Sequence, residues 1–143
     1  ATTDKVAADL KAEMKRSVIE IAKSTLAPSD WYAIREAEGG TAIPADWKTY
    51  RAAVRTTSNA KETAIAALAD VAAVKLYEAH PVTYTRKTVT YAADGTPSYG
   101  APNITTDTTV NKVNWTEEGG HADSWPTAPD HEADPSFVSV ANT

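Results

Sequence analysis

Two clusters near the C-terminal end of the sequence combine histidine with carboxylates. His121 stands two residues before Asp123, and residues 130–132 read Asp-His-Glu, with Asp134 close by. Imidazole nitrogens and carboxylate oxygens are the donors that divalent metal ions bind in proteins. A flexible acidic loop brings the same groups together without binding a metal, and we favour that interpretation. We therefore expect no metal site and no bound cofactor.

No other pattern in the sequence is typical of an enzyme. The chain has no cysteine, which excludes thiolate zinc sites and cysteine nucleophiles. No serine stands in a recognisable arrangement with histidine and aspartate, and the phosphate-binding and dinucleotide-binding fingerprints do not occur. The adjacent Glu117 and Glu118 suit a solvated turn better than an acid/base pair. The sequence predicts a protein without catalytic residues that is not an enzyme.

Four aromatic residues fall close together in the first half of the chain, namely Trp31, Tyr32, Trp47 and Tyr50. Such rings bury a large area while keeping a polar edge for a hydrogen bond. For the two tryptophans we favour a place in the core of a helical bundle. The two tyrosines have an alternative as exposed anchors of an interface, where tyrosine, tryptophan and arginine concentrate binding energy.

Two arginines extend this group. Arg51 and Arg55 stand four residues apart, so on a helix they share one face and can pair with Glu36 or Glu38. The alternative is that they lie on a solvated surface. The candidate interface or scaffold residues are Trp31, Tyr32, Arg35, Trp47, Tyr50, Arg51, Arg55, Trp115 and Trp125.

The composition changes near Pro81. Residues 1–80 hold 11 Lys and Arg against 11 Asp and Glu, whereas residues 81–143 hold 3 against 8 and contain twelve threonines and six of the eight prolines. This is a change from helix formers to strand and turn formers. The sequence predicts an α+β protein, with a helical bundle domain over 1–80 and a β-rich, extended C-terminal region over 81–143.

The first region predicts a small bundle of about four antiparallel helices. Its apolar residues recur at helical spacing, and prolines, glycines and capping residues separate the stripes. The predicted helices are residues 6–26, ended by Pro28; residues 30–38, capped by Ser29 or Asp30 and ended by Gly39-Gly40; a third from Pro44; and a fourth from the capping box of Asn59 and Glu62.

The second region alternates with a period of two and is rich in hairpin and loop signals. We expect one or two exposed strands over 82–91, a turn at Asp94-Gly95, a hairpin partner at 97–105, a further strand over 108–116, and a loop or extended arm over 117–135. This region has too few large apolar residues for a core of its own. It must pack on the helices, on a second copy or on a partner. Unless Trp115 and Trp125 fold back, they expose surface, which suggests such docking.

The chain as a whole is acidic. It has 143 residues, a net charge of −5 and a pI near 5.1, so we expect no nucleic-acid partner, which requires a basic face. It has no run of eighteen apolar residues and no signal-peptide core at its start, so we expect no membrane span and synthesis in the cytoplasm. Ala1 fits either loss of an initiator Met or a fragment boundary.

Residues 16–78 hold a series of distinctive motifs. A helix leads into residues 29–35, Ser-Asp-Trp-Tyr-Ala-Ile-Arg, and an acidic stretch, an Ile-Pro helix start at 43–44 and a Trp…Tyr-Arg…Arg helix over 47–55 follow. Together they resemble a segment of bacteriophage tail proteins of the tail assembly chaperone or tail fibre-associated type. The resemblance implies phage tail or fibre proteins as partners, and it does not extend to residues 81–143.

The motifs also make physical sense as a scaffold. We expect Asp30 to cap its helix and Trp31 to insert under the helix that starts at Pro44. We therefore expect a virion structural protein of the tail or tail fibre, made in the host cytoplasm and built into a homo-oligomer. The alternatives are a transient tail or tail-fibre assembly chaperone and a carbohydrate-binding fibre tip that binds a host surface glycan. The carbohydrate-binding alternative rests on the aromatic residues Tyr91, Tyr99, Trp115 and Trp125.

Overall fold

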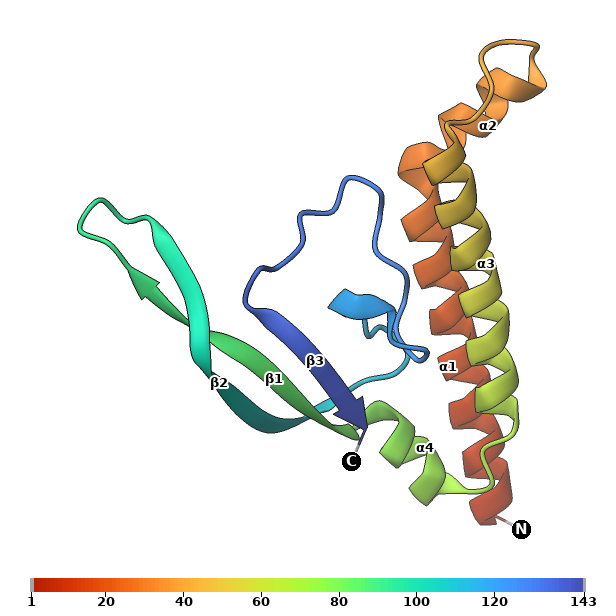
Figure 1. Ribbon diagram of the computed structural model, residues 1–143. Coiled ribbons are helices and arrows are strands. Elements are labelled where there is room, and N and C mark those ends of the chain that lie inside the picture. The colour runs from red at the N-terminus through yellow and green to blue at the C-terminus, as the bar shows by residue number, and fades with distance from the viewer. Residues whose placement is uncertain (1, 143) are drawn as a thin grey trace.

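The chain folds into two arms that diverge from a common base (Figure 1). The computed structural model describes residues 2–142. One arm is helical and the other is a β-hairpin, so the architecture is mixed helix and sheet. The helices are α1 (Thr2–Leu26), α2 (Asp30–Ala37), α3 (Ala45–Ala66) and α4 (Val71–Glu78), with 3-10 turns η1 (Ala27–Ser29) and η2 (Glu118–Gly120). The strands are β1 (His80–Tyr91), β2 (Pro97–Val110) and β3 (Phe137–Asn142).

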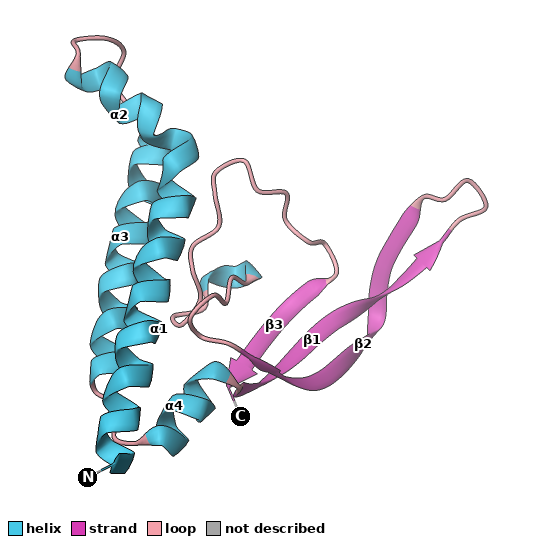
Figure 2. Ribbon diagram, turned by 180° about the vertical axis from the view of Figure 1, so that it is seen from behind, coloured by secondary structure: helices cyan, strands magenta, loops and turns pink. Residues whose placement is uncertain are grey.

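The two long helices, α1 and α3, lie side by side and antiparallel (Figure 2). Their facing stripes bury Met14 and Val18 of α1 against Val54 and Ile65 of α3, and α4 adds Val74. Full burial of one such side chain contributes about 1.5–3 kcal/mol. The packed bundle has three helices, α1, α3 and α4, rather than four, because α2 lies beyond its end and is joined through η1. None of the helices in the described residues is long and apolar enough to cross a membrane.

The predicted helix start at Asn59 is wrong. α3 runs without a break through Asn59 to Ala66. A capping box satisfies amides that lack a partner, but inside a continuous helix those amides already donate to the preceding turn. The last helix begins at Val71 instead, where the Asp70 carboxylate accepts a hydrogen bond from the N–H of Ala73 at 2.8 Å.

The strands form one antiparallel sheet in the order β2–β1–β3. The chain reverses between β1 and β2 at the predicted turn, where the Asp94 carboxylate accepts a hydrogen bond from the N–H of Thr96 at 3.0 Å. Val82, near the start of β1, is fully buried, whereas β2 is exposed along most of its length. The sheet is therefore anchored at its base and open to solvent towards the hairpin turn.

One strand prediction in the second half is wrong, and one strand was not predicted. Residues 108–116 form no separate strand, because β1 is 12 residues long and keeps β2 paired as far as His80 opposite Val110. The chain then turns, with the Asn111 side chain accepting a hydrogen bond from the N–H of Val113 at 3.0 Å. In addition, Phe137–Asn142 forms β3 in a stretch where the sequence predicts no strand.

The segment between β2 and β3 packs against the helical bundle. Trp125 is 3% exposed and Trp115 is 5% exposed, so both fold back against the rest of the chain and do not expose surface for docking. Trp125 lies in the core that contains Val54, and its Nε1–H donates to the Val113 carbonyl oxygen at 2.7 Å. The Trp115 Nε1–H donates to the Tyr84 hydroxyl at 3.1 Å. The extension folds back because the bundle offers apolar surface that the extension lacks.

Candidate interaction site at the free end of the helical arm

The joint between α1 and α2 is held by one buried arginine. Arg51 of α3 is 9% exposed. Its Nη1 donates to the Leu26 carbonyl oxygen at 2.9 Å and to the Ser29 hydroxyl at 2.7 Å, and its Nη2 forms an ion pair with Asp30 at 2.9 Å. Charge-assisted contacts of this kind are the stronger class of hydrogen bond. They fix the direction in which α2 leaves the bundle.

These contacts correct two expectations about the joint. Arg51 pairs with Asp30 and not with Glu36 or Glu38, because it points back towards the end of α1. Asp30 does not cap α2, since the N-cap residue is Ser29 and it makes no side-chain cap hydrogen bond. Arg55, one turn further along α3, lies on the exposed surface.

Four aromatic rings form a continuous row from α2 to α3. Trp31 and Tyr32 stack with ring centroids 4.1 Å apart and planes 26° apart. Tyr32 reaches across to Trp47 at 5.9 Å, and Trp47 meets Tyr50 edge-on at 5.7 Å. Aromatic pairs at these separations attract each other beyond their buried area. The structure thus brings together the four aromatic residues that the sequence singles out.

The row ends in Arg35, which lies over its outermost rings. The guanidinium carbon is 4.9 Å from the Trp31 ring centroid and 5.3 Å from that of Tyr32. Its Nε and Nη2 donate to the carbonyl oxygens of Thr41 and Ala42 at 3.2 and 3.3 Å. A cation over an aromatic face is attracted to the ring electrons. The Arg35 side chain is therefore held in place on both sides.

The turn after α2 completes this support. Gly39 has a φ of +85°, a conformation that favours glycine. A Cβ at Gly40 would lie 2.9 Å from both the Cγ and the carbonyl oxygen of Arg35. The turn can pass this close to α2 only without a side chain at that position.

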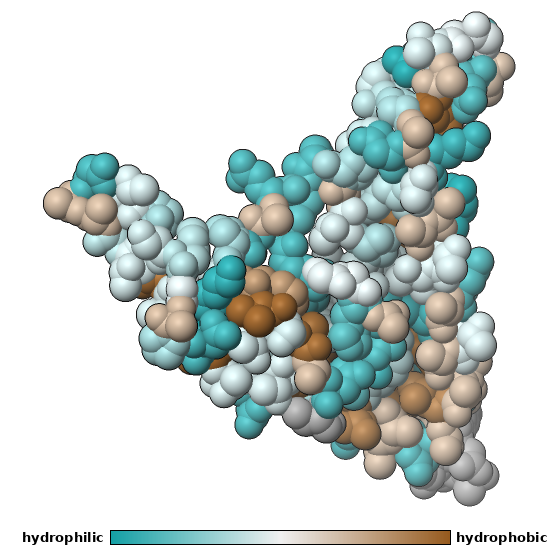
Figure 3. Space-filling view, viewed as in Figure 1, coloured by the Kyte–Doolittle hydropathy of each residue, from teal (hydrophilic) through white to brown (hydrophobic). Residues whose placement is uncertain are grey.

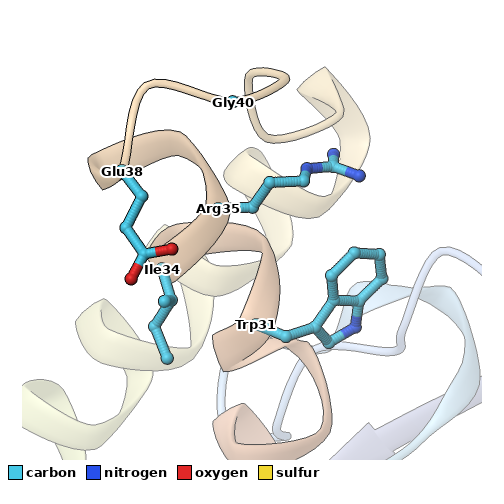
Figure 4. Close-up of a pocket in the computed structure, with 5 residues that line it drawn as sticks. All are labelled: Trp31, Ile34, Arg35, Glu38 and Gly40. Atoms are coloured by element: carbon cyan, nitrogen blue, oxygen red, sulfur yellow. The ribbon is translucent and has the colours of Figure 1, made fainter.

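Trp31 and Ile34 leave much of their apolar surface exposed at this end. Trp31 is 52% exposed and Ile34 is 57% exposed. They line a hollow of about 410 Å³ together with Arg35, Glu38 and Gly40 (Figure 4), and apolar surface is visible over α2 in Figure 3. The expectation that Trp31 inserts under α3 is wrong, because α2 projects past the start of α3 and Tyr32 makes that contact instead.

At the inner end of the row, Tyr50 is partly buried. Burial raises the pKa of its hydroxyl, and the nearby Asp130 carboxylate adds to this effect. The hydroxyl therefore stays protonated and neutral at physiological pH. The row as a whole offers rings, one fixed cation and a neutral hydroxyl, which are groups that can bind a partner.

The histidine and carboxylate clusters tie loops together. The His121 Nδ1 accepts a hydrogen bond from the N–H of Asp123 at 3.1 Å, and the His131 Nε2 lies 2.5 Å from the Glu118 carboxylate. The Asp123 carboxylate pairs with Lys112 at 3.3 Å. Within residues 2–142, no group of three or more such side chains is arranged to hold a metal ion.

Ile34 and Glu38 also line the site, although neither is among the interface residues predicted from the sequence. Their spacing in the sequence could have identified them, because Trp31, Ile34, Arg35 and Glu38 follow the pattern i, i+3, i+4 and i+7 that places residues on one face of a helix.

No protein-family model, curated protein or solved structure matches this chain at a significant level. The site is therefore interpreted from its own geometry.

Proposed function

We propose that this chain is a non-enzymatic structural protein of a bacteriophage tail or tail fibre, which resides in the virion and acts through oligomerisation and protein–protein contacts. The observation that carries the proposal is the exposed surface of Trp31 and Ile34, held rigid by Arg35. The assignment to a phage tail rests on the resemblance of residues 16–78 to tail proteins.

Exposing this apolar surface to water costs free energy. A half-exposed tryptophan beside a half-exposed isoleucine is an apolar patch, and such patches mark contact sites. Tryptophan, tyrosine and arginine are also the residues that dominate interface energetics. Because Arg35 and the stacked Tyr32 already fix Trp31, a partner would not have to order it, and this lowers the entropic cost of binding.

Quantitative mass spectrometry of purified particles from a phage that encodes the chain tests this function. A fixed copy number in every particle supports a structural component. Particles that lack the chain would contradict it and favour the transient assembly chaperone. In a phage carrying Trp31→Ala we expect at least about tenfold less chain in the particle, as for loss of an interface anchor. Leu76→Ala is the matched control, because Leu76 on α4 is similarly exposed at 56%.

The carbohydrate-binding alternative loses two of its four aromatic residues. Trp115 and Trp125 are buried and cannot stack on a sugar. It then depends on Tyr91 and Tyr99, which are 72% and 39% exposed on the hairpin. Glycan binding that disappears with Tyr91→Ala would favour this alternative.

A further inference from the structure

A second exposed apolar surface lies on the outer half of the hairpin. The register pairs Val89 with Tyr99 and Tyr91 with Pro97. Directly paired residues share a face, and so do residues two apart along a strand. These four side chains and Lys87 therefore lie on one side of the hairpin, which we call the hairpin face. Tyr91, at 72% exposed, is its most open residue.

The matching surface on the helical arm is a row of three side chains. Trp31 and Ile34 of α2 and Glu38, the residue that follows its last turn, line the same hollow, with the Trp31 ring on one side of it and Ile34 and Glu38 on the other (Figure 4). We call this row the α2 face. Two apolar residues come first and one carboxylate comes last, and Arg35 flanks the row while tied to the turn after α2.

The two faces cannot meet within one molecule. The end of α2 and the turn of the hairpin are the two outermost points of the arms, and the arms diverge in both views (Figures 1 and 2). Each apolar face is therefore left without a partner inside its own chain. A second copy of the chain supplies both missing partners.

We propose that the hairpin face of one copy docks on the α2 face of a second copy, with Tyr91 against Trp31, Val89 against Ile34 and Lys87 against Glu38. This inference rests on the proposed function and identifies the partner of that same site. Charge complementarity supports the pairing of Lys87 with Glu38, because the Arg35 cation of the same face is held over the Trp31 and Tyr32 rings and against the Thr41 and Ala42 carbonyl oxygens.

The spacings of the two rows are also compatible. Alternate residues of a strand are about 6.6 Å apart along its axis. The steps along α2 are about 4.5 Å from Trp31 to Ile34 and about 6 Å from Ile34 to Glu38. Side chains as long as tyrosine, tryptophan and lysine span the remaining difference.

This contact uses two different surfaces, so it is heterologous. Every copy keeps one free hairpin face and one free α2 face after pairing. Such contacts build a ring if the rotation closes and an open filament if it does not. The wild-type chain should therefore associate beyond a dimer.

Sedimentation velocity of the purified full chain tests the proposal through complementation. We expect Trp31→Ala and Tyr91→Ala each to weaken self-association at least about tenfold, as for loss of an interface anchor. Mixing the two variants should restore a one-to-one dimer that grows no further, because the pair retains one intact hairpin face and one intact α2 face. Leu76→Ala is the matched control, since Leu76 is 56% exposed and lies on α4, outside both faces.

A charge reversal gives an independent readout that leaves the rings in place. Glu38→Lys and Lys87→Glu should each weaken association, and the double variant should recover it. A wild-type chain that stays monomeric overturns the docking, as does a mixture of Trp31→Ala and Tyr91→Ala that stays monomeric while the wild type associates. Neither result bears on the virion proposal, which fails only if purified particles lack the chain.

Discussion

At the scale of single residues, the buried amine of Lys61 ties the second half of the chain to α3. The residue is 4% exposed, and its Nζ donates to the carbonyl oxygens of Lys112 at 2.6 Å and Asp123 at 2.5 Å. Burial lowers the pKa of Lys61 to about 8, against the opposing attraction of the Asp123 carboxylate. The same contact therefore joins the two halves of the chain and makes the stability of the fold sensitive to pH.

The lowered pKa of Lys61 gives stability a defined pH dependence. Unfolded lysine keeps its proton up to its ordinary pKa of 10.5, so between about pH 8 and that value the unfolded chain binds more protons and stability rises with pH. We expect the free energy of unfolding, from urea melts, to rise by about 1–2 kcal/mol between about pH 7.5 and about pH 9.5. Lys61→Met should remove this rise, and an equal rise in the variant would contradict the assignment. Tyr77, whose pKa burial raises to about 12, acts in the opposite sense only above its ordinary value of 10.0.

Some features of the site were predictable from the sequence and others were not. The aromatic row was predictable as a group, because its four members are close in sequence and fall on helices. The sequence did not predict which tryptophan side chain is exposed, because exposure depends on the position of helices that are distant in the sequence. Trp31 is exposed since α2 projects beyond α3, whereas Trp125 is buried by helices that lie far away in the sequence.

Among the helices, Asp70 caps the start of α4, whereas the capping pattern at Asn59 caps no helix. Asp70 accepts a hydrogen bond from the N–H of Ala73, while Asn59 sits in the middle of α3. We expect Asp70→Ala to lower the free energy of unfolding by about 1 kcal/mol through loss of the cap. Asn59→Ala is the matched control and should change it by less than about 0.7 kcal/mol, in the stabilising direction, since alanine is the better helix former. Equal decreases in the free energy of unfolding of the two variants, measured by chemical denaturation, would contradict this prediction.

Helix limits set by local chemistry were predictable from the sequence. α1 ends just before Pro28, α2 ends just before Gly39 and α3 begins just after Pro44. Each limit depends on the backbone of the residue itself or of its neighbour. β3 was not predictable in this way, because it becomes a strand by pairing with β1, as Val140 does with Tyr84. That pairing joins residues far apart in the chain.

At the scale of the whole molecule, the bundle and the extension share one core. Val113 and Trp125 pack with residues of α1, α3 and α4, and Lys61 binds two carbonyls of the extension. The division into a domain over 1–80 and a region over 81–143 stays a prediction. The shared core has a direct consequence for cooperativity, because removing its largest C-terminal side chain should weaken both halves.

Trp125→Ala is the substitution that tests this coupling. It should lower the free energy of unfolding by about 3–5 kcal/mol, a large part of the roughly 5–15 kcal/mol available to a small domain. Hydrogen exchange should show protection falling together in α3 and β1, because the Trp125 indole packs in the core with α3, its backbone N–H donates to the Trp115 carbonyl oxygen, and the Trp115 indole donates to Tyr84 of β1. Trp31→Ala removes the same side chain from an exposed position and should cost less than about 1 kcal/mol. Loss of protection in β1 with unchanged protection in α3 would contradict this coupling. The bundle would then be stable alone, and the extension would only dock on it.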